Sequence, residues 1–456
     1  MELTENKYDL TQGSIANKLM TFFFPIAAGT LFQQLYNTVD AVIVGKFVGT
    51  AALAAVGGSA AMIITLIINF FVGLASGATV VISQYYGSGE REGIERAVHT
   101  AIAFCLVFGA AVTVLGLFLA PWSLRAIHNT PDTMEESIIY LRIYFAGAIP
   151  LMLFNMGSGI LRAVGDSKRP LMFLIVSCVL NIGLDLLFVT VCKMGVAGVG
   201  WATVIALFVS SALTVLTLCK TKESYRLKIS KLRFHRVQLS HMLHIGLPAG
   251  VQGAMYAGSN IIIQSVINGF GTSVVAAWTA TSKLDGVFWA VSNSFGVAIM
   301  AFVGQNFGAG KYDRMKKSVR VCLGIAMVTT LALSALLLCF GEQCMHIFVD
   351  DPVVIDHAVN ILWHFAPFYF VWTFIEVLSN ALRGAGDAVK PMIITIVGVC
   401  ALRIAWCCAV VPFWNTIECV CLCYPFTWAV TAVVFIIYYL RGGWLNRCIT
   451  RLQEGR

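Results

Sequence analysis

Charged residues are scarce in this sequence of 456 residues, where Asp, Glu, Lys and Arg together make up 12%. Soluble domains carry about a quarter charged residues, so a soluble globular protein is excluded. Hydrophobic residues instead make up 58%, and the mean hydropathy is +0.82. Apolar stretches of about 20 residues, long enough to cross a bilayer as a helix, recur along the whole length. The composition therefore predicts an all-α integral membrane protein with many spans.

Several motifs of catalysis and processing are also missing. The sequence has no GxxxxGK[ST] phosphate loop, which argues against ATP-driven pumping by this chain. It has no HExxH or GxSxG motif and no soluble domain to hold a cofactor, so no cofactor is expected. The 14 cysteines lie mostly inside apolar runs and are expected to be small apolar filler rather than a disulfide framework. The polar start MELTENKYDLTQGSIANK lacks the features of a cleavable signal peptide.

The apolar stretches number twelve, and each is predicted to be a transmembrane helix. Their expected spans are 18–44, 52–84, 97–121, 136–161, 170–192, 195–219, 241–268, 273–304, 319–341, 355–382, 391–413 and 420–441. Several are longer than a perpendicular crossing needs, which implies tilt or bending.

Lysine and arginine predict the orientation of these spans. Nearly all basic loop residues fall on the side of the N-terminus, including the run KTKESYRLKISKLRFHR after the sixth span. The opposite side has only Lys46, Arg125 and Lys193. The protein is therefore expected to lie in the plasma membrane, and the positive-inside rule places both of its termini in the cytoplasm. The net charge of +8 is explained by contact with anionic lipid headgroups, without nucleic acid as a partner.

An internal repeat divides the chain into halves. ISQYYGSGEREGIERAV (82–98) returns as VGQNFGAGKYDRMKKSV (303–319), and LRAVGDSKRP (161–170) returns as LRGAGDAVKP (382–391), both 221 residues later. Six helices in each half give the two halves the same orientation, related by an axis along the membrane normal. The expected domains are an N-terminal six-helix lobe (1–219), a cytoplasmic linker (220–240) and a C-terminal six-helix lobe (241–456).

Two carboxylates inside the predicted spans are the strongest functional candidates. Asp40 and Asp185 lie roughly 9 Å and 12 Å from the outer ends of their helices, so they reach a similar depth. Asn181 lies one turn from Asp185 on the same face, and Thr203 enters at a similar level on the next helix. A charged residue at a helix centre costs about 2.5–3.5 kcal/mol on insertion scales, so a functional role is expected by default.

These side chains offer carboxylate, amide and hydroxyl oxygens, which are ligands for a hard cation such as Na⁺. A buried carboxylate with a like-charged neighbour can alternatively hold a proton. A third possibility is that the residues only hydrogen-bond neighbouring helices. In the internal repeat, Asp185 falls opposite Trp406, and the second half has no acidic counterpart of either aspartate. A purely structural requirement would tend to appear in both halves, so this asymmetry favours a dedicated function. Pro25 and Gly29 suggest that the helix bearing Asp40 can bend.

Weaker candidates could line a substrate cavity. They are aromatic and methionine residues, whose side chains can adapt to different ligands, and ionisable residues within the predicted spans. Structural packing or pairing is an equally open explanation for them. They are Tyr36, Met62, Tyr256, Lys283, Asp285, Trp289 and Glu376.

The ordered set FPIAAGTLFQQLYNTVDAVIVG, YYGSGE/NFGAGK and LRAVGDSKRP/LRGAGDAVKP resembles the multidrug and toxic compound extrusion (MATE) family, over about residues 12–442. The nearer branch is the DinF-like one. This resemblance implies export of organic cations and other toxic compounds in exchange for Na⁺ or H⁺. It also implies a cation site in the first lobe at Asp40, Asn181, Asp185 and Thr203. The sequence departs from the NorM-like branch, because the helix at 241–268 has no acidic residue and Glu376 is about one turn displaced.

The sequence therefore predicts a monomeric secondary antiporter that exports amphipathic, often cationic compounds by alternating access. One alternative is a flippase for lipid-linked precursors or polysaccharides within the same superfamily. A second alternative is an intramembrane enzyme that uses Asp40 and Asp185 as an acid–base pair, although it lacks a third catalytic group nearby.

Overall fold

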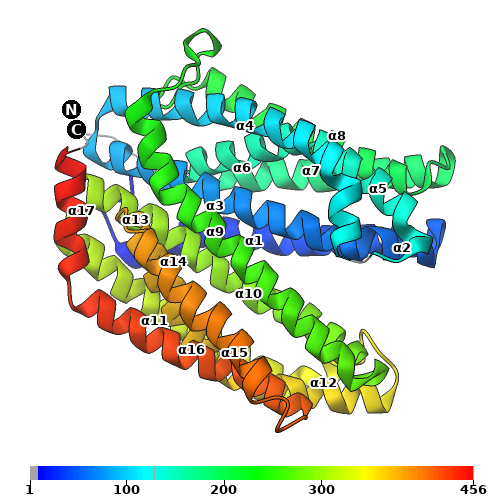
Figure 1. The fold of residues 1–456 in the computed structure, drawn as a ribbon. Coiled ribbons are helices and arrows are strands. Elements are labelled where there is room, and N and C mark those ends of the chain that lie inside the picture. The colour runs from blue at the N-terminus through cyan, green and yellow to red at the C-terminus, as the bar shows by residue number, and fades with distance from the viewer. Residues whose placement is uncertain (1–8, 128, 455–456) are drawn as a thin grey trace. The chain divides into compact units, whose positions relative to one another are not determined.

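The computed structural model describes residues 9–127 and 129–454, and its regular elements there are all helices. The first half comprises α1 (Ile15–Ile43), η1 (Val44–Val48), α2 (Thr50–Gly57), α3 (Ser59–Ser88), α4 (Arg91–Ala126), α5 (Pro131–Ala146), α6 (Ala148–Ala163), α7 (Lys168–Leu186), η2 (Leu187–Val191) and α8 (Gly195–Lys220). Long helices lie side by side within it (Figure 1).

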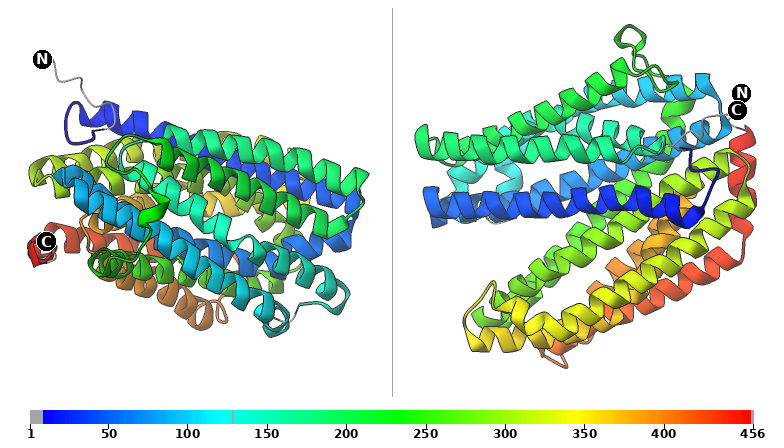
Figure 2. Two further views of the ribbon diagram at one scale, coloured as in Figure 1. Left: turned by 90° about the horizontal axis from the view of Figure 1, so that it is seen from above. Right: turned by 180° about the vertical axis from the view of Figure 1, so that it is seen from behind.

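The second half follows a short turn, η3 (Ile229–Lys231). It comprises α9 (Arg236–Ile267), η4 (Asn268–Phe270), α10 (Thr272–Gly308), α11 (Tyr312–Met345), α12 (Pro352–Phe365), η5 (Ala366–Phe368), α13 (Tyr369–Gly384), α14 (Val389–Thr395), η6 (Ile396–Ala401), α15 (Leu402–Ala409), α16 (Ile417–Leu440) and α17 (Gly443–Glu454). Figure 2 shows the helices of each half from two further directions.

Most of these helices can cross a membrane. Among the described residues, ten helical segments are long and apolar enough, and α5 with α6, bent by 49°, makes an eleventh. The remaining predicted span, 241–268, corresponds to α9, which has 32 residues but does not meet the same test of hydropathy. Its amide, glycine and serine residues in GVQGAMYAGSN lower its apolar character. The prediction of an all-helical, many-span membrane protein is confirmed.

Packing divides the chain into two compact units whose boundaries differ from the expected lobes. Of the described residues, unit 1 contains Asp9 and those within 24–250, and unit 2 contains those within 10–23 and 251–454. The segment 220–250 packs with the first unit, where the sequence placed a linker and the start of the second lobe. Two helices, α1 and α9, each pass from one unit to the other. Pro25 and Pro248 lie within two residues of the two crossing points.

A glycine crossing attaches the start of α9 to α3 inside unit 1. Gly73 and Gly77 on α3 face Gly246 and Gly250 on α9, and both pairs have the four-residue spacing of a GxxxG motif. A Cβ on Gly77 would lie 2.2 Å from the carbonyl oxygen of Met242, and one on Gly246 would lie 2.6 Å from that of Leu74. The two backbones approach this closely because no side chain separates them.

Candidate functional site

The residues predicted to bind the coupling cation come together in unit 1. Asp40 projects from α1, Asn181 and Asp185 from α7, and Thr203 from α8. Asp185 is fully buried, Asn181 and Thr203 are buried, and Asp40 is half-buried. Asn181 and Asp185 face the same neighbours because residues four apart share one face of a helix.

The side chain of Asn181 bridges the two carboxylates. With the amide nitrogen turned toward them, it lies 2.9 Å from Asp40 Oδ1 and 3.1 Å from Asp185 Oδ2. Only the amide nitrogen can donate to carboxylate oxygens, so the two carboxylates fix this orientation of the amide. The two carboxyl groups also contact one another, and Thr203 Oγ1 donates to the Val199 carbonyl at 3.0 Å. The four predicted residues therefore form one polar cluster.

Tyr36 belongs to the same cluster. Its hydroxyl is in hydrogen-bonding contact with the side chains of Asp40 and Thr203. Sequence reasoning expected Tyr36 in the wall of a substrate cavity, but its spacing of four from Asp40 on α1 already indicated a shared helical face. Two buried tyrosines of α5, Tyr140 and Tyr144, complete the surroundings, and sequence reasoning missed both.

Both carboxylates lie just before a π-helical turn. Single π-helical turns inside α-helices occur frequently at functional sites. The turn η1 begins four residues after Asp40, and η2 begins two residues after Asp185. The backbone therefore departs from regular α-helix shortly after Asp40 and shortly after Asp185.

The donor set fits a small hard cation. Two carboxylates, an amide and a hydroxyl supply only oxygen ligands once the amide oxygen turns inward. Asp185 Oδ1 is buried and accepts no hydrogen bond from any described residue, so it can serve as a ligand. Among the described residues, no three His, Cys, Asp or Glu side chains are grouped to hold a metal ion. A proton between the two carboxylates would satisfy the same geometry.

Unit 2 contains a cavity of about 370 Å³. Three of the predicted cavity residues line it: Tyr256 on α9, and Asp285 and Trp289 on α10. The remaining lining residues are mostly aromatic, with a few uncharged polar groups: Asn260, Gln264, Trp278, Ser282, Phe365, Tyr424 and Trp428. One oxygen of Asp285 accepts a hydrogen bond from the Tyr369 hydroxyl. The cavity is therefore an aromatic chamber with one carboxylate.

Arg403 contacts two of the residues that line this chamber. Its side chain is fully buried, its Nη1 donates to Asn260 Oδ1 at 3.2 Å, and its guanidinium lies 4.1 Å from the ring centre of Tyr424. Asn260 and Tyr424 are both lining residues. The guanidinium thus fixes two walls of the chamber by a hydrogen bond and a cation–π contact.

The other cavity candidates lie elsewhere. Lys283 is exposed on α10, and Met62 lies on α3 in the other unit. Glu376 on α13 does not line the chamber, and its Oε1 accepts a hydrogen bond from Asn380 Nδ2 at 2.8 Å. Gly296 makes room for this carboxylate, because a Cβ there would lie 2.2 Å from Glu376 Oε1.

The helix-bend candidates lie in α1. This helix runs without interruption through Pro25, and Thr30 Oγ1 donates to the Ile26 carbonyl at 3.0 Å. Gly29 faces leucine side chains of α7, at ordinary contact distances of 3.5 and 3.6 Å from its Cβ position. A bend at this point remains a prediction.

A polytopic helical protein with a pair of contacting carboxylates inside its membrane spans has the construction of an ion-coupled membrane transporter. The MatE family model matches residues 25–187 and 248–408, so the chain belongs to the MatE family. The two matched segments correspond to the two halves of the internal repeat. Membership in a family of transporters also argues against the intramembrane enzyme considered above.

Named relatives and solved structures agree with this assignment. The "Probable multidrug resistance protein YpnP" of Bacillus subtilis is 26% identical over 438 residues, which cover 96% of this chain and 97% of that protein. A solved multidrug resistance MATE family transporter of the MOP superfamily, in an outward-facing conformation, matches with a TM-score of 0.90 at 23% identity, over 98% of this chain and 100% of the other. A MOP superfamily transporter from Pyrococcus furiosus matches with a TM-score of 0.89 at 23% identity, over 96% and 98%. The two structures establish the fold.

Proposed function

We propose that this protein is a secondary antiporter that exports amphipathic, often cationic, drug-like compounds in exchange for Na⁺ or H⁺. It is a monomer of the cell membrane with both termini in the cytoplasm, and it belongs to the DinF-like branch. The observation that carries this proposal is the contact between the half-buried carboxyl group of Asp40 and the fully buried carboxyl group of Asp185. Two adjacent carboxylates that are largely removed from water repel each other when both are charged, so the pair requires a cation or a proton.

Coupling follows from this requirement. A ligand shifts a conformational equilibrium only if it binds the two states unequally. The cluster takes side chains from α1, α7 and α8, so a small displacement of α1 changes the distance between Asp40 and Asp185 and hence the affinity for the ion. Ion binding therefore favours one arrangement of α1, and substrate binding favours the other.

The aromatic chamber of unit 2 is the proposed substrate site. Aromatic walls hold amphipathic compounds, and the single carboxylate of Asp285 favours a positively charged group. Tyr256 and Trp289 contribute adaptable ring surfaces beside it. Glu376 acts outside the chamber, where it positions Asn380 and through it Arg383.

The flippase alternative is less well supported by the charges of unit 2. A lipid-linked phosphate requires cationic groups that face the ligand. Arg403 is instead covered by Tyr424 and hydrogen-bonded to Asn260, and Lys283 is exposed outside the chamber.

Substrate-dependent cation flux in proteoliposomes tests the proposal. Efflux of a fluorescent cationic dye, driven by an imposed Na⁺ or H⁺ gradient and accompanied by ion movement in the opposite direction, is expected. Dye movement that ignores both gradients would contradict antiport. Transfer of a labelled lipid-linked sugar without dye transport would support the flippase instead.

A further inference from the structure

The connection between α8 and α9 is a fixed surface of unit 1. Residues 221–235 contain buried Tyr225 and Leu227, and the backbone N–H of Leu227 donates to the Leu218 carbonyl at 2.9 Å. Their neighbours Arg226 and Lys228 are exposed. This alternation directs the apolar side chains into unit 1 and the basic side chains outward.

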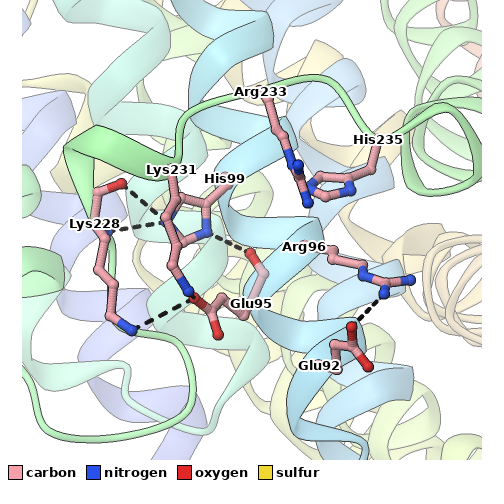
Figure 3. A network of polar contacts seen from close by, with 8 residues as sticks. All are labelled: Glu92, Glu95, Arg96, His99, Lys228, Lys231, Arg233 and His235. Carbon is pink, nitrogen blue, oxygen red and sulfur yellow. Dashed lines mark hydrogen bonds and ion pairs between the residues drawn. The ribbon is translucent and has the colours of Figure 1, made fainter.

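Two residues of α4 hold the connection in place. His99 is buried, its Nδ1 contacts the Glu95 carbonyl at 2.6 Å, and its Nε2 accepts from the Lys228 backbone N–H at 3.0 Å. Further along, the backbone N–H of His235 donates to Thr100 Oγ1 at 3.1 Å. Figure 3 shows the connection lying over α4, with His99 between Glu95 and Lys228. The basic side chains are thus presented from a defined backbone.

Positive charge exceeds negative charge on this surface. One carboxylate, Glu95, faces two ammonium groups, with Lys231 at 2.9 Å and Lys228 at 3.6 Å. In the described part of the chain, Arg226 and Arg233 form no ion pair with an acidic side chain. The surface is therefore suited to an anionic partner.

Large apolar side chains lie among these charges. Ile229 is 68% exposed, Phe234 47% and Val237 49%. These residues follow the end of α8 at Lys220, so they are outside the spans that must face hydrocarbon. Exposed apolar groups mixed with Lys and Arg are typical of segments that lie in the membrane interface, with the apolar groups in the lipid and the charges at the headgroups.

We propose that Lys228, Ile229, Lys231, Arg233 and Phe234 form a lipid platform, which binds anionic phospholipid in the adjoining leaflet. The ammonium and guanidinium groups bind the headgroup phosphate, and Ile229 and Phe234 enter the interface beside its acyl chains. A free phosphate or a nucleic acid would use the charges but leave the apolar side chains in water. The proposal is independent of the transported substrate.

The test compares three variants of the full-length protein. Lys228→Gln/Arg233→Gln removes two charges and leaves the Lys228 backbone bond to His99 intact. Ile229→Ser/Phe234→Ser removes the apolar groups and keeps every charge. Lys193→Gln, in the turn between η2 and α8, is the control for loss of a basic residue elsewhere. Binding of phosphatidylglycerol and of phosphatidylcholine to the solubilised protein is measured by native mass spectrometry.

The charge variant should bind phosphatidylglycerol about twenty-five-fold more weakly, since each of the two basic residues near a membrane surface contributes about fivefold. Its binding of phosphatidylcholine should not change. The apolar variant should weaken binding of both lipids, and Lys193→Gln should behave as the unaltered protein. Equal phosphatidylglycerol binding by the charge variant and the control would overturn the proposal. Full displacement of phosphatidylglycerol by inorganic phosphate, with no effect of the apolar variant, would also overturn it.

Discussion

The glycine crossing of α3 and α9 gives a prediction whose size follows from the structure. Alanine at Gly246 would place a Cβ 2.6 Å from the Leu74 carbonyl oxygen and 3.1 Å from the Leu74 Cα. These are backbone atoms, so the helices must separate rather than a side chain rotate. Overpacking of this kind costs about 1–3 kcal/mol. Alanine also gains about 1 kcal/mol over glycine in a helix.

Gly258→Ala isolates the packing cost. Gly258 lies in the same helix, and a Cβ there would have nothing within 4 Å. It should gain the helix-propensity benefit without any clash, so Gly246→Ala should be less stable than Gly258→Ala by about 1–3 kcal/mol. Because Gly77 lies against Gly246, Gly77→Ala and Gly246→Ala should also be non-additive when combined.

Unfolding in mixed micelles, followed by circular dichroism, measures both differences. If Gly246→Ala proves at least as stable as Gly258→Ala, the close backbone contact between α3 and α9 does not contribute as argued. Transport activity of the two variants separately tests whether α3 and α9 must stay in close contact during the transport cycle.

Three other tests address topology, unit 2 and the connection. Single cysteines in 85–95, 220–240 and 306–316, on a background without reactive native cysteines, should be labelled only from the cytoplasm, and outside labelling at 220–240 would refute the even helix count of the first half. Glu376 lies outside the chamber and Glu376→Gln keeps an acceptor for Asn380, so the substrate profile and ion-driven flux should both persist, and loss of flux for every substrate would contradict a single coupling site in unit 1. Burial and the positive charges of Arg233 and Arg96 lower the pKa of His235. The unfolded connection therefore binds a proton at His235 more readily than the folded one, so protonation favours local unfolding. Amide exchange in 228–235, corrected for its intrinsic pH dependence, should accelerate as the pH falls below about 6.5. His235→Gln should remove this acceleration.

The polar cluster around Asp40 and Asp185 was largely predictable from the sequence. Asn181 and Asp185 share a helical face at a predictable depth, and Asp40 reaches the same depth on another helix, so burial and charge alone pointed to them. Tyr36 was assigned a different role, although its spacing from Asp40 carried the relevant information. Tyr140 and Tyr144 were missed because their position depends on how α5 packs within unit 1.

Features that depend on contacts between distant segments were not accessible. Packing of residues 10–23 with unit 2 and of 220–250 with unit 1 has no local signature, because it is decided by which helices meet in three dimensions. The paired glycines of α3 and α9 show this most clearly. Each GxxxG spacing is visible alone, but about 170 residues separate the two, and only the folded chain brings them together.

The central claim is that Asp40 and Asp185 couple ion movement to efflux, and one measurement tests it most directly. Asn at either position keeps the shape of Asp but cannot carry its charge or release a proton. Asp40→Asn, Asp185→Asn and the control Trp406→Phe, at the place matching Asp185 in the second half, are reconstituted at equal levels. Phe retains the ring contact of Trp406 with Phe426.

Efflux of a cationic dye is then driven by an imposed Na⁺ or H⁺ gradient. Both Asn variants should insert normally and lose ion-driven efflux, down to the rate of protein-free liposomes, while Trp406→Phe should transport as the unaltered protein. Ion-driven efflux that is unchanged in both Asn variants would show that the two aspartates only join helices, and the account of coupling would be wrong.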